Sequence, residues 1–293
     1  MLNTCQPPSC LTEAEKVARL KGMTIQPLMD DYCPKGKLRG EHGLAYLIDD
    51  GASTVLFDTG QTDAFLHNAA AAGADLSGLG AVVLSHGHYD HCGGLAALYS
   101  AIAPARPKLY AGKGFSKRKF ARSDEGLSDI GVPAAALSAP VPSAVEVESL
   151  LELHAGMFIV PRAERKDGSS SPPRFRIVDG GVERLDEFDD EVSLVVDSND
   201  GLVVVTGCAH RGILNIAEAA MRAFPGRPLA TLAGGFHLAD APDETLAKVA
   251  EGIAALAPGR VLCGHCTGTR GFAAIASRVR QTAWLACGMR VEL

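Results

Sequence analysis

The alternation of hydrophobic and polar positions predicts strands and helices in turn from about residue 23 onward. Short, uninterrupted apolar runs such as Ala81–Leu84 are typical of strands buried on both faces. Longer segments such as Ile213–Ala223 repeat apolar residues at the spacing of a helix with one buried side. The pattern therefore predicts a mixed α/β fold that begins with a strand at 23–29.

The same order of elements is predicted twice. The first half has a hairpin, a helix, a strand, a helix and a strand, at 44–49 and 54–57, 63–72, 81–84, 94–101 and 108–111. The second half repeats this order at 192–197 and 202–206, 213–223, 229–233, 244–256 and 260–263. A last helix over 272–284 and a closing strand at 289–293 follow. We therefore expect an internal duplication, with two sheets packed face to face and helices outside.

Two segments fall outside this repeat. Residues 1–22 read as an N-terminal extension with a short helix, and 23–293 as a single domain. Within that domain, 104–190 is rich in Pro, Gly and Ser, which favours irregular structure covering the site.

Composition narrows the possible partners. The chain has 293 residues, 47% of them hydrophobic, and a net charge of −6, so nothing favours nucleic acid or an anionic membrane surface. No apolar run approaches the roughly 20 residues that span a bilayer, and the N-terminus does not resemble a signal peptide. We expect a cytoplasmic protein whose eight scattered cysteines stay reduced. If the substrate is a small anion, local basic residues or bound metal would be needed to bind it, because the chain as a whole is acidic. The sequence does not predict the oligomeric state.

The run His86-Gly87-His88-Tyr89-Asp90-His91 carries the strongest chemical signal. It places three imidazoles and one carboxylate within six residues, directly after a buried strand. Side chains two apart in an extended segment project to the same side, so His86 and His88 can bind one ion. A turn into the next helix would direct Asp90 and His91 toward a second ion. These ligands suit zinc, with manganese or iron as alternatives.

Other polar residues follow the predicted strands of both halves. Strand C-terminal ends are where α/β proteins place ligands, and His210, His237 and His265 stand there. Asp58 either fixes the tautomer of a ligand histidine or only forms a turn. His237, which follows two glycines, is expected to contact substrate or act as an acid, and His42 and Arg162 to contact substrate.

Several motifs together resemble the metallo-β-lactamase superfamily. These are Leu-Phe-Asp-Thr-Gly at 56–60 and Ser-His-Gly-His-Tyr-Asp-His at 85–91. Glu-His-Gly-Leu at 41–44, Thr-Gly-Cys-Ala-His at 206–210, Gly-Gly-Phe-His at 234–237 and Cys-Gly-His-Cys-Thr-Gly at 263–268 are similar to the branch that includes dihydropterin–ribofuranosylaminobenzene phosphate synthase. The resemblance implies a four-layer αββα sandwich and two divalent metal ions.

The resemblance also implies a ligand set. His86 and His88 would bind the first ion, with His210 as the remaining ligand, and Asp90, His91 and His265 the second. Most relatives have a His where this chain has Asp189-Asp190-Glu191, and many have a bridging Asp where Cys208 stands. Whether Cys208, His210 or Asp190 completes the set is left open; Cys208 is either a ligand or a small buried residue.

These residues predict a metal-dependent hydrolase. Two ions sharing a water would lower its pKa and give a hydroxide nucleophile, which Asp90 would orient. His237 would stabilise charge or protonate the leaving group of a small phosphate-containing or ester substrate. One alternative is carbon–nitrogen bond formation like that of the synthase. Another is a metal-binding thiol redox or sensor protein that uses the Cys-x-x-Cys pair Cys263 and Cys266.

Overall fold

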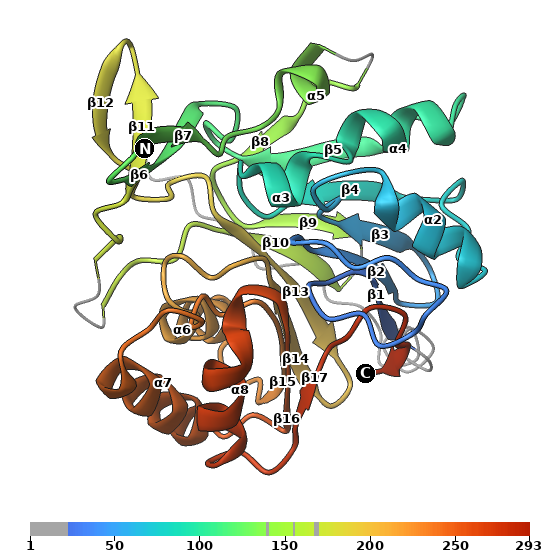
Figure 1. The fold of residues 1–293 in the computed structure, drawn as a ribbon. Helices are drawn as coiled ribbons and strands as arrows, with labels where there is room; N and C mark the ends of the chain where they lie inside the picture. Colours follow the sequence, from blue (N-terminus) through green and yellow to red (C-terminus); the bar gives the residue numbers. More distant parts are fainter. Residues whose placement is uncertain (1–22, 139–140, 155, 167–169) are drawn as a thin grey trace, which may run out of the picture.

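Two large β-sheets pack face to face at the centre of the protein, and helices cover their outer faces (Figure 1). The computed structural model describes residues 23–138, 141–154, 156–166 and 170–293. The predicted N-terminal extension and its helix lie outside these residues. Among the described helices, none is long and apolar enough to cross a membrane.

The first sheet contains the first predicted half. Its order is β18-β1-β2-β3-β4-β5-β8. The strands are β1 (Thr24–Met29), β2 (Ala45–Asp49), β3 (Thr54–Phe57), β4 (Ala81–Leu84), β5 (Lys108–Gly112), β8 (Val145–Val147) and β18 (Val291–Glu292). The helices of this half are α2 (Ala64–Ala71), α3 (Tyr89–Cys92) and α4 (Leu95–Ala101). Strands β3, β4 and β5 are parallel, so their carboxyl ends lie at one edge of the sheet.

The second sheet repeats this arrangement, in the order β17-β16-β15-β14-β13-β10-β9. The strands are β9 (Leu151–His154), β10 (Met157–Pro161), β13 (Val192–Ser198), β14 (Gly201–Thr206), β15 (Leu229–Gly234), β16 (Arg260–Cys263) and β17 (Thr282–Trp284). The helices are α6 (Ile213–Ala223), α7 (Asp243–Leu256) and α8 (Gly268–Ala276), with a 3-10 turn η1 (His265–Thr267). A hairpin, a helix, a strand, a helix and a strand thus occur twice, as predicted.

Three apolar clusters fill the spaces between the four layers. One packs α2 and α4 against the first sheet through Phe65 and Leu98. The second lies between the two sheets and contains Phe57 and Leu194. The third packs α6, α7 and α8 against the second sheet through Ile216. The fold is therefore the predicted αββα sandwich.

The prediction of irregular structure over 104–190 was wrong. This segment contributes β5, β8, β9 and β10 to the two large sheets. Four more of its strands form a separate sheet in the order β12-β11-β6-β7, which we call the covering sheet. Its strands are β6 (Arg118–Ser123), β7 (Gly126–Asp129), β11 (Phe175–Asp179) and β12 (Val182–Leu185); helix α5 (Ala134–Ser138) follows β7. These strands are short and largely polar, and so lack the apolar runs used to predict strands. The Gly180-Gly181 turn between β11 and β12 was the overlooked signal for a hairpin.

The C-terminal region differs from the prediction as well. The helix predicted over 272–284 ends at Ala276, and Thr282–Trp284 instead forms β17, parallel to β16. The closing strand is present as β18, paired with β1.

Candidate metal centre

The histidine-bearing loops converge where the two sheets meet. His86, His210, His237 and His265 follow β4, β14, β15 and β16 respectively. These strands run parallel within their sheets, so the loops at their carboxyl ends lie at the same edge. The two predicted halves thus contribute to one site.

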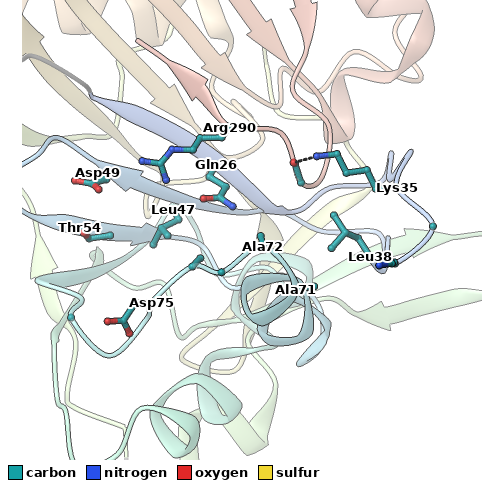
Figure 2. Close-up of a pocket in the computed structure, with 16 residues that line it drawn as sticks. Gln26, Lys35, Leu38, Leu47, Asp49, Thr54, Ala71, Ala72, Asp75 and Arg290 are labelled. Atoms are coloured by element: carbon teal, nitrogen blue, oxygen red, sulfur yellow. Dashed lines mark hydrogen bonds between the residues drawn. The ribbon is translucent and has the colours of Figure 1, made fainter.

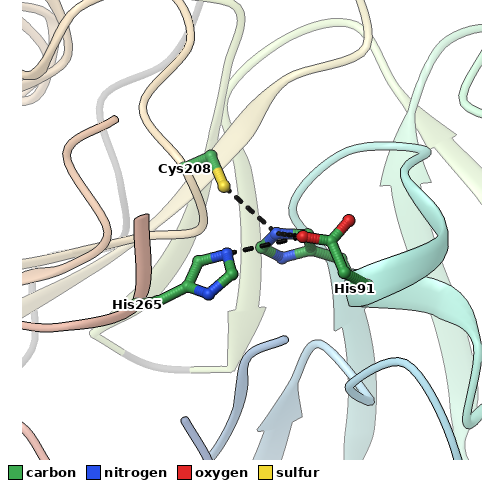
Figure 3. Close-up of side chains that lie close together, drawn as sticks. His91, Cys208 and His265 are labelled. Carbon is green, nitrogen blue, oxygen red and sulfur yellow. Dashed lines mark hydrogen bonds and ion pairs between the residues drawn. The ribbon is translucent and has the colours of Figure 1, made fainter. Parts of the chain in front are cut away.

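One group of side chains combines a carboxylate, a thiol and two imidazoles. Asp90, His91, Cys208 and His265 each offer a ligand atom, and these atoms lie within 4.8 Å of one another. The Oδ2 atom of Asp90 is 3.5 Å from Nε2 of both His91 and His265, and Cys208 Sγ is 3.2 Å from His91 Nε2 (Figure 3). All four residues are buried. We call this group the second cluster.

The other group consists of imidazoles alone. His86, His88 and His210 offer ring nitrogens within 4.8 Å of one another, and we call them the first cluster. Nε2 of His86, His88 and His265 and both ring nitrogens of His210 are buried without a hydrogen-bond partner among the described residues. Buried polar atoms are seldom left unpaired, so such convergent nitrogens fit bound cations.

Asp58 orients two of these imidazoles. Its Oδ2 accepts a hydrogen bond from Nδ1 of His91 at 2.7 Å and from the Ser85 hydroxyl at 2.7 Å. The same hydroxyl lies 2.9 Å from His86 Nδ1, so both rings direct Nε2 into the site. Burial by itself lowers the pKa of His91, but the carboxylates of Asp90 and Asp58 raise it to about 9. The structure thus places Asp58 behind His91, a candidate ligand.

Asp31 supports the second cluster from the opposite side. Its Oδ1 lies 2.6 Å from His265 Nδ1, and its Oδ2 lies 2.9 Å from His42 Nδ1. Burial alone would raise the pKa of Asp31, but the hydrogen bonds from these two imidazoles hold it well below its usual range. His42 Nε2 is 3.4 Å from Asp90 Oδ2. His42 therefore lies beside the second cluster.

Asp190 is placed away from both clusters. Its Oδ2 accepts the backbone N–H of Gly87 at 2.8 Å, and its Oδ1 pairs with the Lys119 ammonium at 2.7 Å. Both carboxylate oxygens are thus engaged. Of the three residues left open by the sequence, the structure brings Cys208 and His210 into the clusters and assigns Asp190 to the support of the His86–His88 backbone.

A cavity of about 1130 Å³ opens over both clusters. His88, Asp90, Cys208, His210 and His265 line it, together with His42 and His237. The His237 ring lies 4.4 Å from the His210 ring, and its Nδ1 has no hydrogen-bond partner among the described residues. Both predicted substrate-contacting histidines therefore face the cavity beside the clusters.

The structure does not place Arg162, which was expected to contact substrate, at the cavity. Its guanidinium pairs with Asp189 at 2.6 Å on the surface, and the residue does not line the cavity. Arg122, Arg165 and Arg174 line it instead. Arg174 lies 4.9 Å from the Phe175 ring centroid, at the start of β11. Sequence reasoning missed Arg122 and Arg174 because the covering sheet that presents them was not predicted, and Arg165 because it lies in an irregular loop after β10.

A second cavity, of about 620 Å³, lies away from the clusters. Gln26, Lys35, Leu47 and Arg290 are among its lining residues, beside α2 on the outer face of the first sheet (Figure 2). None of the predicted site residues lines it, so it is separate from the candidate centre.

Backbone strain is concentrated at the candidate centre. Asp58, Phe188, Ala209, His237 and His265 have φ between 48° and 63°, and the one other described non-glycine residue with positive φ is Ala257. Left-handed conformations are unfavourable for such residues and persist where surrounding contacts hold them, often at functional sites.

The four-layer sandwich and its two clusters define a class of α/β protein with a candidate metal centre between its sheets. The chain belongs to the metallo-beta-lactamase superfamily, whose family model matches residues 38–265. This is a superfamily of enzymes, mostly hydrolases, that typically bind divalent metals.

Individual relatives differ in described activity. The chain is 25% identical over 270 residues to 7,8-dihydropterin-6-methyl-4-(beta-D-ribofuranosyl)-aminobenzene-5'-phosphate synthase of Methanocaldococcus jannaschii, covering 86% of this chain and 90% of that one. It is 31% identical to a protein of known crystal structure, Tm1679, which is described as a metal-dependent hydrolase of the beta-lactamase superfamily. The two structures superpose with a TM-score of 0.81 over 92% of this chain and 99% of that one. Zinc-bound PqqB from Methylobacterium extorquens shares the fold at 14% identity, a TM-score of 0.57 and coverage of 92% and 100%.

Proposed function

We propose that this protein is a metal-dependent hydrolase with two divalent cations, zinc before manganese or iron. His86, His88 and His210 would hold the first, and Asp90, His91, His265 and Cys208 the second. The observation that carries this proposal is a group of buried imidazole nitrogens that converge at the floor of a large cavity and have no hydrogen-bond partner in the described part of the chain. When bound, two such cations would supply a water of lowered pKa and polarise the carbonyl or phosphoryl oxygen of the substrate, so that its carbon or phosphorus atom is more readily attacked.

The protein's own residues would perform the remaining steps. Asp90, which faces His42 and both clustered histidines, would orient the nucleophile. His237 would stabilise charge or protonate the leaving group from the cavity wall. The arginines that line the cavity favour an anionic small molecule with a phosphate-containing or ester group. Nucleic acid and membranes are not required by this proposal.

Hydrolysis can be tested with chromogenic phosphodiesters and carboxylic esters. We expect turnover by protein that retains its metal, loss of turnover after chelation, and recovery on adding back zinc or manganese. Metal analysis of gently purified protein should give close to two ions per chain. Fewer than one ion per chain, or turnover unaffected by chelation, would contradict the proposal.

Replacing Asp58 by Asn should weaken metal binding about 10- to 100-fold, because His91 Nδ1 loses its carboxylate acceptor. Asn tolerates the left-handed backbone at this position, where φ is 63°. Competition with a chromogenic chelator measures the change. Asp50→Asn is a matched control, since this buried carboxylate lies 3.2 Å from His154 Nε2, outside both clusters. Equal effects of the two substitutions would argue against the role of Asp58.

The Cys208 thiol gives a spectroscopic test of the ligand set. Cobalt-substituted protein should show a sulfur-to-cobalt charge-transfer band that Cys208→Ser removes, because only a coordinated thiolate produces it. Cys92→Ser is the control; that thiol is also buried, and contacts the carbonyl oxygen of His86 at 3.3 Å. A band that survives in Cys208→Ser would exclude Cys208 as a ligand.

Synthase-like carbon–nitrogen bond formation is a second candidate function, favoured by the 25% identity to the Methanocaldococcus jannaschii synthase. Product analysis with a dihydropterin diphosphate and an aminobenzene partner separates the two functions. A coupled adduct would favour synthesis, and the hydrolysed pterin alone would favour hydrolysis.

The thiol redox alternative has less support. Cys263 is packed in the apolar cluster beneath α6, α7 and α8, whereas Cys266 lines the cavity. Replacing both by Ser should leave metal-dependent turnover in place; a requirement for the pair would revive this alternative.

A further inference from the structure

The segment 186–191, which joins β12 to β13, contacts both parts of the first cluster. Asp190 Oδ2 accepts the N–H of Gly87, the residue between His86 and His88. Glu191 accepts the N–H of His210 at 2.6 Å. One short segment thus holds the backbone on each side of the three imidazoles.

Phe188 provides a third contact through its ring. It stacks on the His210 ring with a centroid distance of 3.9 Å and an interplanar angle of 9°. The Phe188 and His88 rings are also in T-shaped contact, with a centroid distance of 5.5 Å. Phe188 has φ 54°, and Asp186 Oδ1 accepts its backbone N–H at 2.8 Å. The left-handed backbone that aims this ring is therefore held by Asp186.

Lys119 holds the segment 186–191 in place through two buried ion pairs. It comes from β6 of the covering sheet, and its side chain is completely buried. Its ammonium pairs with Asp186 at 2.9 Å and Asp190 at 2.7 Å and lies 5.1 Å from the Phe188 ring centroid. Buried ion pairs are often no more stabilising than apolar side chains of similar volume, so stability alone does not account for this arrangement.

We propose that Lys119, Asp186, Asp190 and Phe188 form a positioning unit that sets the cation affinity of the first cluster. Through this unit the covering sheet, which lines the substrate cavity, also controls the geometry of the three imidazoles. The second cluster is held by Asp58 and Asp31, neither of which is part of this unit. Damage to the unit should therefore weaken one cation site selectively. This inference rests on the proposed dinuclear function.

The test is a cadmium titration followed by cadmium-113 NMR, with chelator competition for affinities. Wild-type protein should give two resonances, one shifted by sulfur coordination at the second cluster. Lys119→Met should weaken binding at the sulfur-free site about 10-fold or more and leave the other within about twofold. Lys117→Met is the matched control. Lys117 directly precedes β6 of the covering sheet, but its ammonium pairs with Asp179 at the surface.

Phe188→Leu and Asp190→Asn provide the same test if Lys119→Met fails to fold. They remove the ring stack or weaken the Lys119 pair without leaving two uncompensated carboxylates, and each should weaken the sulfur-free site selectively. Folded variants with unchanged affinities, or with equal losses at both sites, would overturn the positioning role. Wild-type protein that binds fewer than two cadmium ions would instead contradict the dinuclear function itself.

Discussion

Replacing Asp90 by Ala should lower kcat/KM at least about 1000-fold, equivalent to about 4 kcal/mol of transition-state stabilisation. Three imidazoles lie within 3.5 Å of the Asp90 Oδ2 atom, those of His42, His91 and His265. Cys208 belongs to the same cluster. The substitution removes both a proposed ligand and the group proposed to orient the nucleophile. Metal content should fall toward one ion per chain.

Steady-state kinetics combined with metal analysis would measure this effect. Asp75→Ala is the control, because Asp75 is an exposed carboxylate whose described contacts are with Ser77, outside both clusters. An Asp90→Ala variant that retains two ions and turnover within about tenfold of wild type would contradict the role of Asp90.

Replacing Gly87 by Ala should lower the free energy of unfolding by about 3 kcal/mol or more. A Cβ atom there would overlap the carbonyl oxygen of Phe115 and lie 2.8 Å from its carbonyl carbon. Both are backbone atoms, so no side chain can move aside to make room. The strain must displace the turn that carries His86 and His88, and metal binding at the first cluster should fall as well.

Chemical denaturation and metal stoichiometry would test this expectation. Gly36→Ala is the matched control, since a Cβ atom at Gly36 would have no neighbour within 4 Å. If both variants unfold at the same denaturant concentration, close packing at Gly87 does not contribute measurably to stability, and the prediction is contradicted.

Much of the central fold was predictable because its strands and helices have strong apolar patterns. The buried strand Ala81–Leu84 and the helix Ile213–Ala223 have the bounds expected from sequence. The covering sheet was not predictable in this way, since β7 is exposed throughout and half of β12 is charged, with Glu183 and Arg184 side by side in the chain. Its stability depends on contacts made by folding, including the buried pairs of Lys119.

The candidate centre shows the same division. Most residues of the two clusters could be predicted from the sequence, because they belong to the motif at 86–91 or are histidines at the ends of predicted strands. Asp31 lies two residues after the end of β1 and was overlooked, although carboxylates near strand ends commonly orient ligands. Phe188 and Lys119 carried no signal, because stacking on His210 and pairing with Asp190 join segments far apart in the chain.

Each cluster takes residues from both halves of the duplicated chain. His86 and His88 meet His210, and Asp90 and His91 meet Cys208 and His265. Neither half alone contains a complete cation site, so a bound ion would act as a cross-link between them, adding its binding free energy to their association. Separately expressed halves should therefore reassemble more tightly when metal is present.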